Sequence, residues 1–311
     1  MSMLRHFVVA VLFSVATAAQ AEALKPFVLG DTPSGDLAAV AAQVKTKLQG
    51  AGFQVVGSYN PYPHAVVIAV TNAELREAAT RAHDENGGFG VVERVAVTSV
   101  DGAIEVSYVN PAYTGVAYGL GSKLPKTTEA LKKALGARFE YGAAGIDEAR
   151  LKPGEYRYAI GMPYFNQIDV LAEHADYKTA VDAVERNLAS KRGGTAKVYR
   201  VDLPNEISVF GVAIAPGDGA EAGAKDTDRE IMDIIDFQRP RSTAYLPYEL
   251  MVKGREVIAL RARYRIAVNF PDLKMFGKNS FGKIMSAPEG IKTALTAVAS
   301  PSSATVAGGP Q

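Results

Sequence analysis

The segment DLAAVAAQVKTKL, residues 36–48, is matched in the second half of the chain by DYKTAVDAVERNL, residues 176–188. Each segment begins with an aspartate, which favours a helix N-terminus, and each places apolar residues at the spacing of one helix face. A second pair of similar segments follows, EALKKAL from Glu129 and EGIKTAL from Glu289. Two helices repeated in the same order predict one α+β unit that is built twice.

The chain length agrees with two such units behind an export signal, because 311 residues are enough for two domains. The expected boundaries are a signal peptide at 1–21, a first α+β unit at 22–138, a linker at 139–155, a second unit at 156–299 and a disordered tail at 300–311.

The N-terminal segment is typical of a secretory signal peptide. A basic residue, Arg5, precedes an apolar run, and the run ends in Ala-Gln-Ala at 19–21. A membrane anchor is the alternative, but the run is shorter than the roughly 20 residues of a spanning helix. We therefore expect a periplasmic protein with no integral membrane segment after signal removal.

Net charge and residue composition argue against several classes of function. A formal net charge of +1 argues against a nucleic-acid-binding protein, which normally presents a basic face. The chain has no cysteine, which excludes disulfides, thiol catalysis and thiolate metal sites. We expect no cofactor.

The apolar pattern predicts the order strand–helix–strand–strand–helix–strand–strand–helix in each half, an α+β class with antiparallel hairpins. Within it we expect Asn110-Pro111 to break a strand that resumes at Val116–Leu120, and a long strand over Glu256–Val268. A Gly/Ala-rich loop is expected at 216–224.

This pattern resembles domain-of-unknown-function family 302. The resemblance rests on the Gly-Phe-x-Val-Val stretch of residues 52–56, on the apolar strand after the proline turn, and on a hairpin followed by Asn-Pro. The cysteine-containing segment of that family is absent from this chain. Because the family's small α+β domains pair as dimers, the resemblance implies two units that form a pseudo-dimer within one chain. It implies architecture and no particular activity.

Histidines and carboxylates give no catalytic pattern. The histidines after the signal, His64, His83 and His174, have no paired ligand spacing, so structural roles are expected and a metal site is not predicted, although one assembled from separate segments stays open. Asp228, Glu230, Asp233 and Asp236 are interpreted as a solvated helix face. No GxSxG, P-loop or post-strand GxGxxG motif is present.

Tyrosines and asparagines around the proline turns are the closest approach to a ligand site. They offer apolar walls with neutral hydrogen-bonding groups, which suits a small polar ligand held between domains. If the units are equivalent, Asn110 and Asn269 occupy like positions. The alternative is that these residues cap turns and pack in strands. The predicted ligand-binding residues of this group, with the adjacent histidine, are Tyr62, His64, Asn110, Tyr113, Tyr118 and Asn269.

Three arginines, Arg261, Arg263 and Arg265, alternate along the expected strand over Glu256–Val268 and would project from one face. Such a face could hold an anion or an acidic partner, and Arg263 and Arg265 are included among the ligand-binding residues. The alternative is a solvated face covered by the acidic middle helix.

The sequence favours an exported binding protein that recognises a small ligand or a protein partner between two related domains. The alternatives are a cell-envelope enzyme with a dispersed active site and an accessory factor of an envelope complex.

Overall fold

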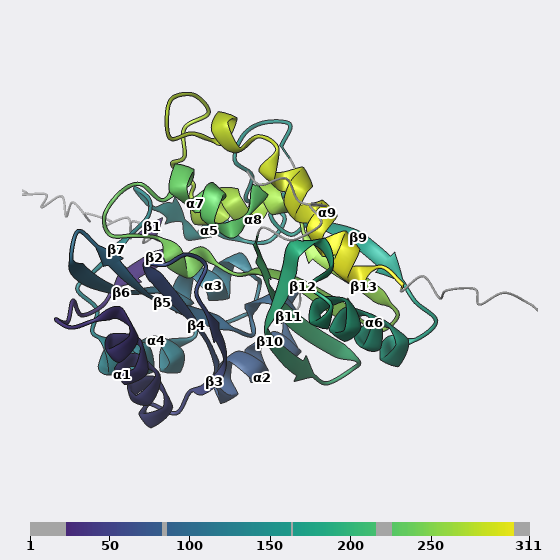
Figure 1. Ribbon diagram of the computed structural model, residues 1–311, viewed down its shortest axis with the longest axis horizontal. Helices are drawn as coiled ribbons and strands as arrows, with labels where there is room; N and C mark the ends of the chain where they lie inside the picture. The colour runs from purple at the N-terminus through teal and green to yellow at the C-terminus, as the bar shows by residue number, and fades with distance from the viewer. Residues whose placement is uncertain (1–22, 83–85, 163, 216–225, 302–311) are drawn as a thin grey trace, which may run out of the picture.

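The protein is an α+β fold with two large antiparallel sheets and a small two-stranded one (Figure 1), seen in a computed structural model that describes residues 23–82, 86–162, 164–215 and 226–301. The expected signal peptide, His83, the 216–224 loop and the tail beyond residue 301 lie outside the described residues.

The first unit is built on a six-stranded sheet of order β3-β4-β5-β6-β2-β7. Its elements are β2 (Phe27–Leu29), α1 (Leu37–Gly50), β3 (Gln54–Tyr59), β4 (Ala65–Thr71), α2 (Ala73–Arg81), the 3-10 turn η1 (Gly87–Gly90), β5 (Glu93–Val100), β6 (Ala103–Val109), α3 (Pro111–Ala117) and α4 (Pro125–Leu135).

The second unit is built on a five-stranded sheet of order β10-β11-β12-β13-β9. Its elements are β9 (Ile168–Glu173), α6 (Tyr177–Ala189), η2 (Arg192–Gly194), β10 (Thr195–Leu203), β11 (Ile207–Ile214), α7 (Asp228–Ile235), η4 (Thr243–Tyr245), β12 (Tyr248–Lys253), β13 (Glu256–Leu260), α8 (Ala262–Asn269), η5 (Phe281–Ile284) and α9 (Ala287–Ala299).

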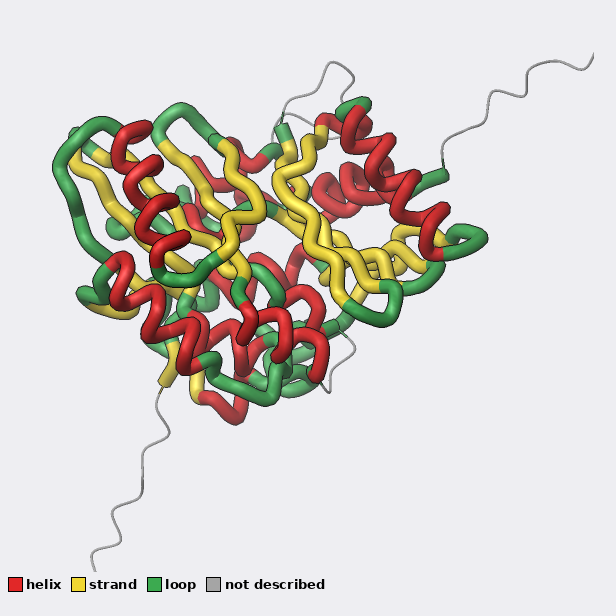
Figure 2. The backbone as a smooth tube through the Cα atoms, turned by 90° about the horizontal axis from the view of Figure 1, so that it is seen from below, coloured by secondary structure: helices red, strands yellow, loops and turns green. Residues whose placement is uncertain are grey.

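The two units share one topology. In each, the first strand returns to pair with the fifth, which gives the order β3-β4-β5-β6-β2 in one sheet and β10-β11-β12-β13-β9 in the other. Figure 2 shows the two sheets side by side, with helices on their outer sides. The repeated segments form the expected helices α1 and α6, and each is capped by its aspartate: Asp36 accepts from the Ala39 N–H at 2.9 Å and Asp176 from the Thr179 N–H at 2.7 Å.

The segment 139–155, expected to be a linker, carries regular structure. Its strand β7 (Phe139–Tyr141) pairs with β2 and completes the first sheet. Strand β8 (Ile146–Asp147) pairs with β1 (Ala23–Leu24), and α5 (Glu148–Leu151) follows. The connection between the units is therefore anchored to the first unit.

Two predicted strand segments are helical in the structure. Strand β6 ends before Asn110-Pro111 as expected, but the pair then starts α3: the Asn110 side chain accepts from the Ala112 N–H, and proline fits the first helical turn. The expected strand at Val116–Leu120 is therefore absent, because Val116 lies within α3. The strand expected over Glu256–Val268 ends at Leu260, and α8 follows. Asn110 thus starts a helix and Asn269 ends one, so they are not equivalent.

The units contact one another through equivalent elements. The edge strands β3 and β10 meet so closely that a Cβ on Gly57 would lie 2.0 Å from the Val198 carbonyl oxygen. The turn η1 packs against β11 and β12 of the second unit, and the corresponding turn η4 packs against β4, β5 and β6 of the first. Each of these turns therefore packs on the sheet of the other unit.

A buried ion pair lies on this seam between the units. Both edge strands carry a β-bulge next to the seam. Directly after the bulge, the residues paired across three neighbouring strands are Gly57, Ala69 and Arg94 in the first unit, and Tyr199, Gly211 and Glu249 in the second. Arg94 and Glu249 therefore occupy equivalent positions, and the Arg94 guanidinium bonds the Glu249 carboxylate at 2.6 Å with both side chains buried.

Glu249 is the centre of a larger buried network. Its second oxygen accepts from the Arg265 Nε at 3.0 Å, and its first also accepts from the Tyr199 hydroxyl at 3.0 Å. Arg94 additionally donates to the Ala244 carbonyl oxygen at 3.1 Å. One buried carboxylate thus pairs with two arginines, one from each unit.

The replacement Glu249→Gln is expected to lower the free energy of unfolding by about 3–5 kcal/mol, because it leaves two buried arginines without a counter-charge. Arg94→Met is expected to cost less, because Glu249 keeps Arg265 as a partner. Urea unfolding followed by circular dichroism measures both. Asp182→Asn, in an exposed pair with Lys178, is the control. Equal effects of the three replacements would contradict this ranking.

Candidate functional site

Two clefts open along the seam between the units, on either side of the segment that follows α7. The Lys25 cleft has a volume of about 780 Å³. Lys25 and Phe139–Ala143 line it from the first unit, and residues within the segments 235–242 and 270–279 line it from the second unit. The Tyr62 cleft, of about 640 Å³, is lined by Tyr62, His64 and Thr98–Gly102 of the first unit and by residues of α7 and the two following loops. Asp236, Phe237, Lys278 and Asn279 border both.

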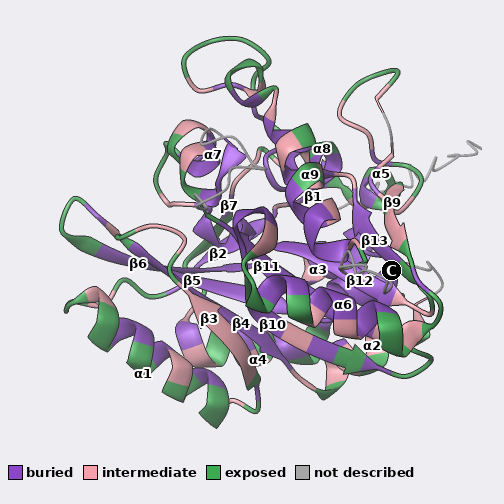
Figure 3. Ribbon diagram, turned by 45° about the vertical axis from the view of Figure 1, so that its right-hand side comes forward, coloured by how far each residue is buried: buried purple, intermediate pink, exposed green. Residues whose placement is uncertain are grey.

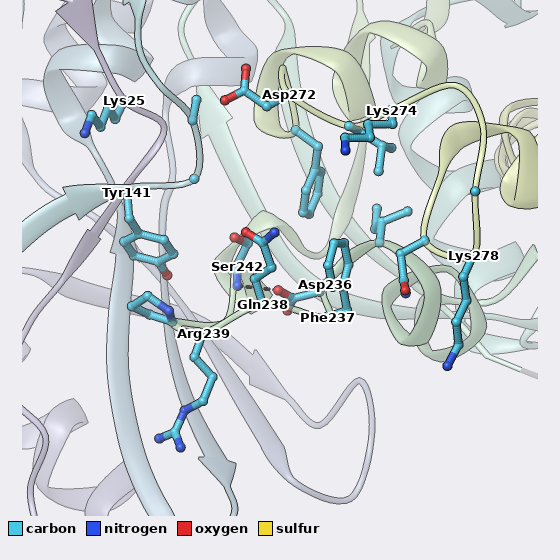
Figure 4. A pocket seen from close by; sticks show the side chains of 18 of the residues that line it. Lys25, Tyr141, Asp236, Phe237, Gln238, Arg239, Ser242, Asp272, Lys274 and Lys278 are labelled. Atoms are coloured by element: carbon cyan, nitrogen blue, oxygen red, sulfur yellow. Dashed lines mark hydrogen bonds between the residues drawn. The ribbon is translucent and has the colours of Figure 1, made fainter.

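The Lys25 cleft combines an aromatic wall with cations (Figure 4). Phe139, Phe237 and Phe276 line it and are exposed to solvent. Figure 4 places the Lys25 side chain on one side of the cleft and those of Lys274 and Lys278 on the other, with Asp236 at its lower edge.

The loop that separates the clefts is fastened to the sheet of the first unit. Glu105 on β6 accepts from the Arg239 Nε at 2.7 Å and from the Arg241 backbone N–H at 2.9 Å. The Tyr141 hydroxyl donates to the Arg241 carbonyl oxygen at 2.5 Å. These bonds hold Asp236, which precedes the loop, against the first unit.

Asp236 is the buried carboxyl group shared by both clefts. It accepts from the Ser242 N–H at 2.7 Å and from the Thr243 hydroxyl at 3.3 Å. Burial raises the pKa of Asp236 to about 7, against the opposing effect of the Ser242 N–H and of Arg241. Near neutral pH both the protonated and the ionised form of this group are therefore populated.

A chain of hydroxyl groups leads from Asp236 to Tyr62. The Thr243 hydroxyl lies 2.6 Å from the Tyr62 hydroxyl oxygen. Because Thr243 donates its only hydroxyl proton to Asp236, it accepts from Tyr62. Burial, followed by the nearby Asp236 carboxylate, raises the pKa of Tyr62, so Tyr62 stays protonated at neutral pH.

The structure places only Tyr62 and His64, of the eight predicted ligand-binding residues, in a seam cleft. Asn110 and Asn269 are buried and bond backbone carbonyl oxygens, of Lys25 at 3.0 Å and of Arg265 at 2.7 Å. Tyr113 is buried and donates to the Val268 carbonyl oxygen, which joins α3 to α8. Buried Tyr118 packs its ring edge-to-face on Phe165.

The predicted basic stripe does not exist, because the strand ends at Leu260 and helix α8 follows directly. Arg261 precedes α8, Arg263 is exposed, and Arg265 is buried against Glu249. Arg263 lines a separate small apolar crevice with Tyr158, Phe270 and Phe281. A shared anion site on one face is therefore excluded for these three arginines.

Asp236 is the site residue that the sequence interpretation missed. It was assigned to a solvated helix face together with Asp228, yet both are buried, and Asp228 accepts from the Tyr59 hydroxyl at 2.9 Å. The sequence gives only a weak sign that Asp236 is buried. The apolar residues Ile234 and Ile235 directly precede it, and otherwise the segment has an ordinary amphipathic pattern.

Metal binding has no geometric support in the described part of the chain, where no three histidine or acidic side chains converge. His174 bonds the Ala299 carbonyl oxygen through its Nε2 at 2.8 Å, and His64 is exposed. Among the described helices, none has both the length and the apolar character needed to span a bilayer.

No model of a known protein family matches the chain, and a search of curated proteins finds no significant match.

Asp236→Asn is expected to flatten the pH dependence of stability. In wild type the unfolded chain loses this proton near pH 3.8, whereas the folded protein keeps it to about pH 7. This stabilisation is full below about pH 4 and is lost as the pH rises to about 7, an effect of up to about 4 kcal/mol at 1.4 kcal/mol per pKa unit. Urea unfolding at several pH values measures it.

Glu93 and Asp228, whose pKa values burial raises to about 8 and about 7, contribute in the same direction and remain in the variant. The free energy of unfolding of Asp236→Asn is therefore still expected to fall as the pH rises, but by less than that of wild type. Parallel pH profiles for wild type and Asp236→Asn would contradict the assignment.

Proposed function

We propose that this protein is an exported, periplasmic binding protein that takes a small polar ligand at the seam between its two α+β units. The observation that carries the proposal is the pair of clefts around Asp236, each lined by both units. Their volumes fall in the range of small-molecule sites, about 300–1,000 Å³, and such sites prefer domain interfaces.

The polar groups of the Tyr62 cleft suit a ligand that carries both donors and acceptors. Hydroxyl groups of Tyr62 and Thr98, the amide of Asn279 and the charges of Asp236 and Arg241 border one space. Each Asp236 oxygen accepts one bond from the protein and has capacity for another from a ligand. The exposed Phe237 beside it offers an apolar surface to the same ligand.

The shared strand order and the reciprocal contacts support a further part of the proposal, that the chain is a fused pair of domains resembling family 302. The N-terminal sequence supports export.

Native mass spectrometry of the protein purified from the cell envelope tests the proposal, with the expectation of a retained small molecule. Asp236→Asn and Tyr62→Phe are each expected to weaken binding of the retained molecule about tenfold. Such a loss corresponds to one hydrogen bond to the charged Asp236, or to the hydroxyl chain that joins Tyr62 to it. Calorimetric titration measures the change.

Asp182→Asn, on the exposed face of α6, is the matched control and should bind as wild type does. Absence of any retained molecule, together with no response to a panel of amino acids, sugars and nucleotides, would refute the proposal.

A cell-envelope enzyme is the second candidate, and the raised pKa of Asp236 favours it, since a carboxyl group that titrates near pH 7 suits general acid–base catalysis. In that case Asp236→Asn would abolish conversion of the bound molecule while leaving it bound.

A further inference from the structure

Two loops project from the same end of the molecule, as Figures 1 and 3 both show. One spans residues 157–162, before β9. The other spans residues 273–286, between α8 and α9, and includes η5. We refer to these two loops together as the tip.

The tip exposes large apolar side chains to solvent. Ile160 is 92 % exposed, Phe276 85 % and Met285 58 %. Met275, beside Phe276, is 38 % exposed. Single exposed apolar residues are ordinary on a protein surface, but a group gathered on projecting loops marks an interaction surface.

The charge of the tip has one sign. Its loops contain Arg157, Lys274, Lys278 and Lys283 and no aspartate or glutamate. None of the three lysines forms an ion pair with another described residue. The nearest acidic residue in sequence, Asp272, is turned to the linker segment, where it accepts from the Ala144 N–H at 2.7 Å.

The two loops are joined at their base. The Tyr158 hydroxyl donates to the Leu273 carbonyl oxygen at 2.6 Å. Met162 of one loop and Met275 of the other line the same small crevice. Within the second loop, the Phe281 N–H donates to the Lys274 carbonyl oxygen at 2.8 Å.

We propose that the tip docks the protein on the anionic surface of a phospholipid bilayer. Exposed aromatic and aliphatic side chains would enter the boundary between headgroups and acyl chains, and the lysines would contact phosphate groups while their stems stay apolar. The uniform positive charge argues for an anionic lipid surface, because a basic cluster next to such a surface gains about 1 kcal/mol per lysine. The overall charge of +1 does not oppose this, since the attraction is local.

Co-sedimentation of the mature full chain with vesicles tests the proposal. We expect binding to vesicles of equimolar phosphatidylcholine and phosphatidylglycerol, weak binding to phosphatidylcholine alone, and a decrease with added salt. Ile160→Ser and Met285→Ser are each expected to weaken binding about tenfold, from the apolar area removed. Lys283→Gln is expected to weaken it about fivefold.

These three residues line neither seam cleft, so their replacement leaves the proposed ligand site intact and a failure of one proposal does not affect the other. Lys132→Gln, on the distant helix α4, is the charge control and should bind vesicles as wild type does.

Equal binding to both vesicle types, or unchanged binding of the Ile160, Met285 and Lys283 variants, would overturn the proposal. So would dimerisation in light scattering that Ile160→Ser abolishes, because a second copy of the chain would then be the occupant of the tip.

Discussion

The ion pair between Arg94 and Glu249 sets the relation of the two units. The two residues occupy equivalent positions, so in a symmetric dimer the same side chain would stand at both and like charges would meet across the axis. A single chain can place arginine on one copy and glutamate on the other. The guanidinium and the carboxylate are both buried and lie 2.6 Å apart. Such a pair favours this packing of the two units over others, because separating the partners would leave a buried charge unpaired at a high cost in free energy.

The seam fixed by this pair also creates the clefts. Because η1 and η4 each pack on the other unit's sheet, residues of both units belong to two of the hydrophobic clusters, and only the cluster under α1 and α4 is confined to the first unit. The segment after α7 is drawn across the seam by Glu105 and Tyr141, which buries Asp236 and shifts its pKa. The unusual carboxyl group is therefore a consequence of how the units pack, and its chemistry belongs to neither unit alone.

Local signals predicted much of the fold and little of the site. The capped helices α1 and α6 follow from residues within a few positions of each other, so sequence alone predicts them. The strand expected after Asn110-Pro111 is absent because the same pair that ends a strand also suits the start of a helix. The prediction that Arg261, Arg263 and Arg265 share one face is wrong, because alternate residues share a face only in a strand. Strand β13 ends at Leu260, before these residues. Tyr62 and His64 were found through their turn, whereas the burial of Asp236 depends on strands more than 100 positions away, as in the pair of Arg241 and Glu105, 136 positions apart.

Differential scanning calorimetry of the mature full chain tests most directly whether the two units form one body joined through a shared, charged seam. The account predicts one transition whose van't Hoff and calorimetric enthalpies agree, because neither unit can lose its structure without exposing the other's core. Two resolved transitions, or a van't Hoff enthalpy about half the calorimetric value, would show that the units unfold independently and would contradict the account.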